Sequence, residues 1–297
     1  MGDILIGTTS WTDKTLIDCK RFYPPGVNTA EARLRYYASR FPIVEVDSTY
    51  YGLPSEHNAL LWSQRTPPGF VFHVKAFRLF TQHQTPPEAL PADLRARARL
   101  VPRKSVYYRN LPAEIVDELW LRFTRALEPL RATGRLGAIV FQYPPWFMYG
   151  EESFEHVAQC AQRLPGDLIA VEFRHRSWFG ERSRAETLAF ERRLGLVHVV
   201  TDAPRGFASS VEPVWEATHP ALALVRLHGR NASTWSKSTA TAAERFDYLY
   251  SDEELREFVP PLRRLALQVE AVHVLFNNCR DDKAQRNAAS LRAMIQT

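Results

Sequence analysis

Eight short apolar runs recur along the chain, and longer stretches with helical spacing of their apolar residues lie between them. Short runs rich in β-branched and aromatic residues indicate buried β-strands. Strands joined through a helix run parallel, because a parallel connection needs a long crossover. The alternation therefore predicts repeated β-α-β units in one parallel sheet. The expected strands span residues 4–11, 43–50, 70–77, 136–143, 168–174, 197–202, 221–228 and 272–277.

The stretches between these runs carry the spacing of amphipathic helices. In the stretch 112–133, the apolar residues Ile115, Leu119 and Phe123 share one face of a helix. Residues 203–220, after the sixth expected strand, show no helical pattern. The expected helices span residues 29–40, 55–65, 112–133, 153–164, 183–194, 252–268 and 282–295.

The number of strands distinguishes a closed barrel from an open sheet. Eight parallel strands match the closure of a (β/α)8 barrel. An open doubly wound sheet is the competing architecture, but no G-x-G-x-x-G motif follows the first expected strand. We therefore predict an α/β fold, a single TIM-barrel domain over residues 1–297, with a long insertion after the third strand at about 78–111.

Several classes of protein are disfavoured by the sequence. No apolar run approaches the roughly 20 residues that cross a bilayer, so we expect no membrane partner. The amino-terminal residues lack the features of a signal peptide, which makes the cytoplasm the expected compartment. Cys19, Cys160 and Cys279 are scattered and form no metal-binding spacing, so they are expected to be reduced thiols without a role. No pattern indicates an oligomeric state.

Each expected strand becomes polar at its carboxyl end, where a barrel of this kind has its active site. Alternate residues of a strand share a face, so Glu172 and Arg174 face the same way, as do Arg226 and His228. Charged side chains inside a barrel are unfavourable unless they are paired. Because polar residues recur at this end of every strand, we predict a functional pocket at the barrel mouth.

Four of these residues are the expected catalytic candidates: Glu172, Lys75, Asp202 and His228. Glu172 is the best general acid or base, although a structural ion pair with Arg174 is an equal alternative. Lys75 could contact a substrate anion, act as an amine nucleophile, or be a lysine that extends to solvent. His228 could be a base, or a histidine held by structural hydrogen bonds.

Other residues near the strand ends are expected to bind substrate. Glu45 lies deeper in its strand than Asp47, so a salt bridge in the core is its expected role. Aromatic residues, including Tyr143 and Trp235, could form stacking walls for a sugar or base, or belong to the core. The expected binding residues are Trp11, Asp47, Tyr50, Gln142, Arg174, Trp178, Arg226, Gly229 and Asn277.

A metal site is a minor alternative. Glu172, Asp202 and His228 could supply two oxygen ligands and one nitrogen ligand to zinc or manganese. Arg174 and Arg226 stand beside them in the sequence and would repel a divalent cation. We therefore expect no cofactor and no metal ligands.

A basic run covers residues 94–109, LRARARLVPRKSVYYR. It contains Arg95, Arg97, Arg99, Arg103, Lys104 and Arg109 and no acidic residue. Such a run could contact the phosphates of a nucleic acid. A solvated loop is the favoured interpretation, because most charged runs are solvated.

Ten segments of the sequence resemble one known family. The chain is similar to the domain of unknown function 72 family from about residue 4 to residue 295. The segments are IGTTSW, FYPPG, VEVDSTYYGLPS, FVFHVKAF, LGAIVFQYPPWF, AVEFRHRSW, VTDAP, VRLHGRN, FDYLYSDEEL and FNNC. The resemblance implies a TIM barrel and assigns no reaction.

The resemblance also implies a set of recurrent polar or aromatic positions: Trp11, Tyr50, Lys75, Gln142, Glu172, Arg174, Trp178, Asp202, Arg226, His228, Gly229 and Asn277. The family commonly has Asn where this chain has Asp47, so the chain carries an added charge there. The loop that contains residues 246–250, FDYLY, is expected to fold over the pocket.

These observations predict a hydrolase-like enzyme that acts on a small or oligomeric substrate carrying an anion or a sugar. Glycoside hydrolysis with Glu172 and Asp202 is one version, and phosphoester hydrolysis is another. One alternative is a nucleic-acid-binding protein that uses the basic run at residues 95–109 and the aromatics of the mouth. A barrel that binds a metabolite without turnover is the other alternative.

Overall fold

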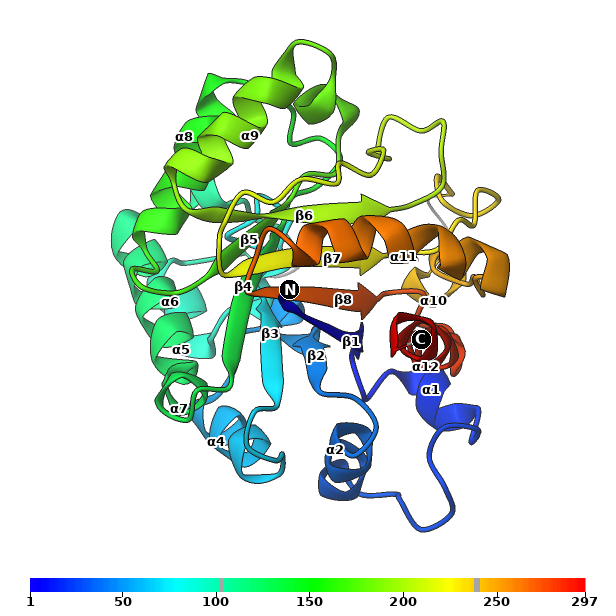
Figure 1. Cartoon of the computed structure of the whole chain (residues 1–297). Coiled ribbons are helices and arrows are strands. Elements are labelled where there is room, and N and C mark those ends of the chain that lie inside the picture. The colour runs from blue at the N-terminus through cyan, green and yellow to red at the C-terminus, as the bar shows by residue number, and fades with distance from the viewer. Residues whose placement is uncertain (102–103, 238–240, 297) are drawn as a thin grey trace.

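The computed structural model describes residues 1–101, 104–237 and 241–296. Eight parallel strands form a closed barrel in chain order, with helices around it (Figure 1). The predicted (β/α)8 fold is confirmed. The strands are β1 (Asp3–Thr9), β2 (Ile43–Val46), β3 (Val71–Lys75), β4 (Leu136–Gln142), β5 (Ile169–Glu172), β6 (Leu196–Asp202), β7 (Leu222–Leu227) and β8 (Ala271–Phe276).

The seven predicted helical stretches are found with small shifts at their ends, whereas the short helices α1, α3, α5 and α10 were not predicted. The stretch 112–133 is divided, because α6 ends at Ala126 and α7 begins with Pro129 near its amino end. Between β6 and β7 the described residues contain no helix, as the sequence indicated. The helices are α1 (Lys14–Asp18), α2 (Ala30–Ala38), α3 (Ser48–Tyr51), α4 (Glu56–Gln64), α5 (Ala92–Arg97), α6 (Ala113–Ala126), α7 (Glu128–Ala132), α8 (Glu151–Gln162), α9 (Ser183–Arg193), α10 (Ala242–Arg245), α11 (Asp252–Ala266) and α12 (Lys283–Gln296). No helix in the described part of the chain is long and apolar enough to cross a membrane.

The second strand is shorter than predicted. Residues 43–50 were expected as one strand, but β2 ends at Val46 and α3 follows at once. The hydroxyl of Thr49 lies 2.9 Å from the carbonyl oxygen of Val46 and 2.6 Å from that of Lys75, so it ties this turn to β3. The high β-propensity of Thr and Tyr made this turn look like a strand.

A layer of apolar residues crosses the barrel interior beneath the polar residues of the mouth. Small and aliphatic residues of alternate positions, such as Val140, Ala170 and Leu224, form the apolar layer. The next inward positions of the same strands are Gln142, Glu172 and Arg226, because residues two apart share a face. The polar network is therefore built directly on the apolar layer that sets the strand register.

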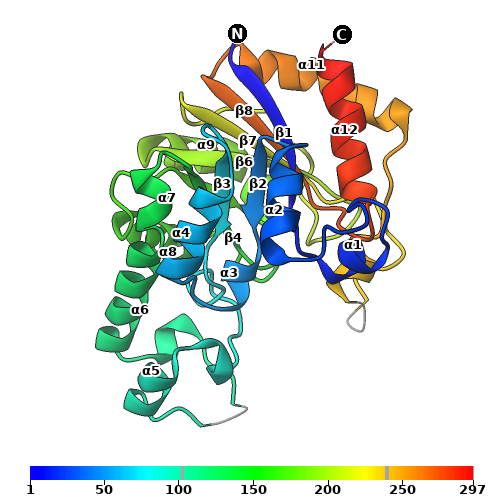
Figure 2. The ribbon, with the colours of Figure 1, turned by 90° about the horizontal axis from the view of Figure 1, so that it is seen from below.

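The insertion after β3 carries its own short elements. They are the 3-10 helices Pro87–Ala89 and Tyr108–Asn110, and α5. One antiparallel bridge between Thr85 and Val106 closes the insertion at its base. Figure 2 shows α5 at the end of the molecule opposite both chain termini. Of the basic run, Arg97, Arg99, Lys104 and Arg109 are exposed, whereas Arg103 lies outside the described residues.

Candidate active site

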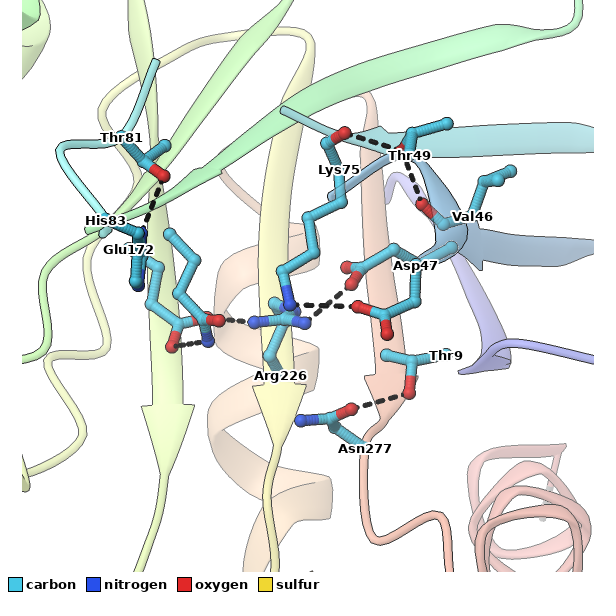
Figure 3. A network of polar contacts seen from close by, with 12 residues as sticks. Thr9, Val46, Asp47, Thr49, Lys75, Thr81, His83, Glu172, Arg226 and Asn277 are labelled. Atoms are coloured by element: carbon cyan, nitrogen blue, oxygen red, sulfur yellow. Dashed lines mark hydrogen bonds and ion pairs between the residues drawn. The ribbon is translucent and has the colours of Figure 1, made fainter. Parts of the chain in front are cut away.

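Arg226 joins two buried carboxylates at the centre of the barrel (Figure 3). Its Nη2 donates to Oε1 of Glu45 at 2.6 Å, and its Nη1 donates to Oε2 of Glu172. All three side chains are fully buried. Burial alone would lower the pKa of Arg226, but the two carboxylates outweigh it and raise the pKa. The core salt bridge predicted for Glu45 is confirmed.

The carboxylate of Glu172 is surrounded by donors. Its Oε1 accepts from Nε2 of Gln142 at 2.7 Å, and lies 3.0 Å from Nε2 of His228 and 3.5 Å from Nη1 of Arg174. Burial raises the pKa of Glu172, but Arg226 and His228 outweigh it and hold the pKa well below the usual range. Glu172 is therefore an ionised anchor for four side chains.

A chain of hydrogen bonds orients His228. Its Nδ1 lies 2.8 Å from Nδ2 of Asn277, and Oγ1 of Thr9 donates to Oδ1 of Asn277 at 2.6 Å. Burial lowers the pKa of His228 to about 4, so the imidazole is neutral. Because the amide nitrogen of Asn277 is a donor, Nδ1 of His228 accepts and Nε2 carries the proton toward Glu172.

Lys75 pairs with Asp47 rather than with Glu172. Its Nζ donates to Oδ1 of Asp47 at 2.9 Å and lies 4.6 Å from the ring centre of Tyr50. Burial lowers the pKa of Lys75, but Asp47 outweighs it and the pKa is raised. An ammonium held in this way is a poor amine nucleophile. The negative charge of Asp47 balances the positive charge of Lys75.

His83, a residue of the insertion, packs edge-on against the ring of Tyr50 at 5.2 Å and lies near three cations. The guanidinium of Arg78 lies 5.1 Å from the ring centre of Tyr50, and that of Arg174 lies 4.9 Å from the ring centre of Trp235. Burial, followed by the charges of Lys75, Arg78 and Arg174, lowers the pKa of His83 to about 3. Oγ1 of Thr81 lies 2.8 Å from Nδ1 of His83, and so fixes the imidazole (Figure 3).

Arg78 differs from the other cations of the mouth. No ion pair joins it to a carboxylate within the described ranges, and its buried Nε has no hydrogen-bond partner. By contrast, Lys75, Arg174 and Arg226 each have a carboxylate within 4 Å. The mouth therefore keeps one cation whose charge is not balanced by a paired acid.

Asp202 lies in a separate network. Its carboxylate accepts from Nε of Arg230 at 3.0 Å and from the hydroxyl of Tyr250 at 2.7 Å. The hydroxyl of Tyr250 also accepts from the backbone nitrogen of Gly229 at 2.8 Å. This network fixes the start of the loop after β7, and none of these hydrogen bonds involves Glu172. Among the described residues, no group of three His, Cys, Asp or Glu side chains could hold a metal ion.

The loop after β7 folds over His228, as predicted for residues 246–250. The ring of Phe246 is stacked on that of His228 at 5.7 Å, and lies 6.0 Å from the ring of Trp235. Nε1 of Trp235 donates to Oγ of Ser209 at 3.0 Å. These rings cover one side of the polar network and keep water from it.

Gly229 is required by the geometry of this loop. Its φ of +86° lies in the left-handed region, and a Cβ added there would meet Cβ of Tyr248 at 2.6 Å. We expect Gly229→Ala to lower the free energy of unfolding by about 1–3 kcal/mol, from backbone strain and overlap together. Urea unfolding followed by circular dichroism measures the change. Gly134→Ala is the matched control for strain alone, because it has a positive φ and open space around it. An equal loss in both variants would contradict the role of Tyr248.

Two of the aromatic residues predicted to bind substrate, Trp178 and Trp11, are buried. Trp178 is fully buried, stacks on Phe173 at 3.7 Å, and donates through Nε1 to the carbonyl oxygen of Phe147 at 2.8 Å. It packs among the rings of Phe147, Phe154 and Phe173. Trp11 is 6% exposed and packs edge-on against Trp62 at 5.9 Å. It borders a cavity of about 230 Å³ that Asp47 also lines.

Comparison with known proteins identifies the family. A profile described as "Protein of unknown function DUF72" matches residues 5–297. The chain belongs to the DUF72 family. UPF0759 protein YunF of Bacillus subtilis (strain 168) is 31% identical over 295 residues, which are 98% of this chain and 94% of that protein.

Crystal structures of two DUF72 proteins have the same fold. The one from Thermotoga maritima MSB8 is 29% identical, with a TM-score of 0.76 and coverage of 99% of this chain and 100% of that chain. The one from Enterococcus faecalis V583 is 23% identical, with a TM-score of 0.81 and coverage of 99% and 96%. Membership of the DUF72 family confirms the resemblance seen in the sequence motifs. The reaction has to be inferred from the site itself.

The sequence did not indicate three residues of the mouth. Arg78 and His83 lie in the insertion, and Trp146 lies in the loop after β4, where no periodic pattern gives direction to a side chain. The nearest signal for Arg78 was its position three residues after Lys75, and for Trp146 the Pro-Pro pair before it. Neither signal indicates that these residues meet.

Proposed function

We propose that the barrel mouth of this DUF72 protein is the active site of an enzyme that binds an anionic substrate and hydrolyses a phosphoester. The observation that carries the proposal is the placement of Lys75 and Arg78 over the ring of Tyr50, 4.6 and 5.1 Å from its centre, while the same ring packs against His83 at 5.2 Å. Arg174, from the end of β5, adds a third charge that acts on His83. The positive charges of Lys75, Arg78 and Arg174 repel one another near the neutral imidazole of His83, which destabilises the site when it is empty. A bound anion would relieve that repulsion, which gives the site its preference for negative charge.

The charge balance supports an anion rather than a neutral sugar. Arg226, Arg174 and Lys75 are opposed by Glu45, Glu172 and Asp47, which leaves Arg78 in excess. Arg78 stacks on Tyr50, which directs its guanidinium while leaving donors free. A guanidinium with free donors suits the paired oxygens of a phosphate.

His83 is the group best placed to move a proton. Its Nδ1 is held by Thr81, and no described residue is within hydrogen-bond distance of its Nε2. When a phosphoester binds, its negative charge raises the pKa of His83 toward the useful range. Nε2 then takes a proton from the attacking water while the water oxygen bonds to phosphorus, and the bond from phosphorus to the leaving oxygen on the opposite side breaks. The leaving oxygen takes a proton from solvent, and the imidazolium releases its proton to solvent.

Glu172 has a positioning role in this proposal. Its carboxylate already accepts from Gln142, His228, Arg174 and Arg226, so it has no free position for a substrate proton. Asp202 is committed to Arg230 and Tyr250. The paired carboxylates that glycoside hydrolysis needs are therefore not supplied by these two residues.

Binding and turnover test the proposal together. We expect inorganic phosphate to bind the protein in isothermal titration calorimetry, and Arg78→Met to weaken binding about tenfold or more, as loss of a charge-assisted hydrogen bond requires. His83→Gln should reduce kcat on bis(p-nitrophenyl) phosphate by about 100-fold with little change in KM.

Arg97→Met is the matched control, because Arg97 is exposed on α5, away from the described contacts of the mouth. It should bind phosphate as the unmodified protein does. Absence of phosphate binding, or equal binding by Arg78→Met, would overturn the anion site. Turnover of a neutral p-nitrophenyl glycoside in preference to the phosphodiester would overturn the proposed reaction.

A further inference from the structure

An exposed aromatic residue, Trp146, lies against His83, next to the cations Lys75, Arg78 and Arg174. The ring of Trp146 lies 5.7 Å from that of His83 at an interplanar angle of 74°. Trp146 is 60% exposed, although tryptophan is usually largely buried. A large ring left in solvent beside a group of cations suggests a contact with a ligand rather than with the core.

A cavity of about 320 Å³ adjoins Trp146. It lies between the insertion, which contributes Tyr107 and Arg109, and the loop after β4, which contributes Trp146 and Met148. Met148 is 54% exposed and Tyr107 is 36% exposed. The volume lies at the lower end of the range for small-molecule sites, and suits one ring system.

Three polar side chains that line this cavity, Gln82, Ser153 and His156, already have partners within the protein, whereas Arg109 and Glu152 are exposed at its rim. Gln82 lies 3.1 Å from Nδ1 of His156, whose Nε2 lies 2.8 Å from the carbonyl oxygen of Phe80. Oγ of Ser153 donates to the carbonyl oxygen of Met148 at 2.7 Å. A sugar needs many free partners for its hydroxyls, whereas a flat aromatic ring needs apolar and aromatic faces. The cavity therefore fits a planar ring.

We propose that Trp146, Tyr107, Met148 and Arg109 form a subsite for a planar heteroaromatic ring attached to the bound anion, so that the substrate class is a nucleotide. This inference rests on the proposed anion site. The ring stacks on Trp146 while its phosphate reaches Arg78, past the contact between Trp146 and His83. Stacking on an aromatic side chain beside a cation is how proteins bind single bases and unpaired strands.

Three ligands of increasing size test the subsite: inorganic phosphate, ribose 5-phosphate and adenosine 5′-monophosphate, each titrated calorimetrically. We expect the adenine ring to strengthen binding about tenfold over ribose 5-phosphate, as base stacking on an aromatic residue does. Trp146→Ala should remove that gain and leave phosphate affinity unchanged. Trp146→Phe should keep most of it. Leu121→Ala, at a residue that is 62% exposed on α6, is the control and should change nothing.

The outcomes separate this inference from the proposed function. Phosphate binding that depends on Arg78, with equal affinity for adenosine 5′-monophosphate and ribose 5-phosphate, would overturn the ring subsite alone. Failure of all three ligands to bind would overturn the anion site first. A single-stranded oligonucleotide that binds more tightly than the mononucleotide, with the same loss in Trp146→Ala, supports the subsite with a nucleic acid as the source of the ring. Equal affinity supports it with a free nucleotide.

Discussion

Replacing Arg226 by Met should lower the free energy of unfolding by about 3–5 kcal/mol, because it leaves Glu45 and Glu172 buried without their common cation. Both carboxylates and the guanidinium are fully buried, so water cannot replace the lost partner. Desolvation already raises the pKa of Glu45, and the missing charge would act on both acids at once. Urea unfolding at pH 7.5, followed by circular dichroism, measures the loss.

Two further variants make this result specific. Arg35→Met removes an exposed arginine paired with Glu31 at 2.9 Å, and should change stability little because solvent screens that pair. The triple variant Glu45→Gln, Glu172→Gln, Arg226→Met also removes the two unpaired carboxylate charges. It should recover part of the lost free energy of unfolding if those charges cause the loss. A loss below about 1 kcal/mol in Arg226→Met would show that the buried triad contributes little, against the expected range.

The barrel could be predicted because its strands are covered on both faces. Such strands are nearly continuous apolar runs, as in Val197–Val200 and Ala271–Phe276, and these stand out from amphipathic helices. The turn at Asp47 could not be predicted, because Thr49 is held by contacts to Val46 and to Lys75, which lies on another strand. A contact between strands overrides local propensity there.

The residues of the polar network were largely predicted, but the way they pair was predicted only in part. Strand parity placed Glu172, Arg226 and His228 inward, and the structure joins them. The alternation of side chains along a strand did not indicate that Lys75 would pair with Asp47, because several acidic residues near the mouth could have paired with this lysine. Arg78 and His83 depend on how the insertion folds back, which is set by contacts distant in sequence.

The polar interior also sets how the protein responds to acid. Three buried histidines, His73, His228 and His273, are neutral in the folded protein. His73 accepts from the backbone nitrogen of Ala138 through Nδ1 at 3.0 Å, so its Nε2 donates to Nδ1 of His273 at 2.8 Å. Burial lowers the pKa of His228 and of His273 to about 4, and lowers that of His73 well below the usual range. Protonating either imidazole of the His73–His273 pair adds a charge and removes an acceptor.

We therefore expect the free energy of unfolding to fall steadily as the pH drops from about 6.5 toward 4. In that window the histidines bind protons in the unfolded chain but not in the folded protein. The free energy of unfolding therefore rises with pH. Each histidine contributes about 1.4 kcal/mol per pH unit, so His73, His228 and His273 contribute about 4 kcal/mol together at pH 5.5. His83, whose pKa is lowered to about 3, adds a similar share to that of any one of them. That is a large part of the stability of an ordinary domain, about 5–15 kcal/mol. Urea unfolding at pH 7.5, 6.5 and 5.5 gives the slope, and hence the number of protons taken up.

Single variants assign the slope to its source. His273→Asn removes one titrating group and keeps an amide oxygen that can accept from Nε2 of His73, so its slope should be smaller by about one proton. His57→Gln removes a histidine that is exposed on α4, and should leave the slope unchanged. Equal free energies of unfolding at pH 7.5 and 5.5 would mean that these histidines are protonated in the folded protein. Nδ1 of His73 could then no longer accept from the backbone nitrogen of Ala138, and Nδ1 of His228 would need the side-chain oxygen of Asn277 in place of its nitrogen.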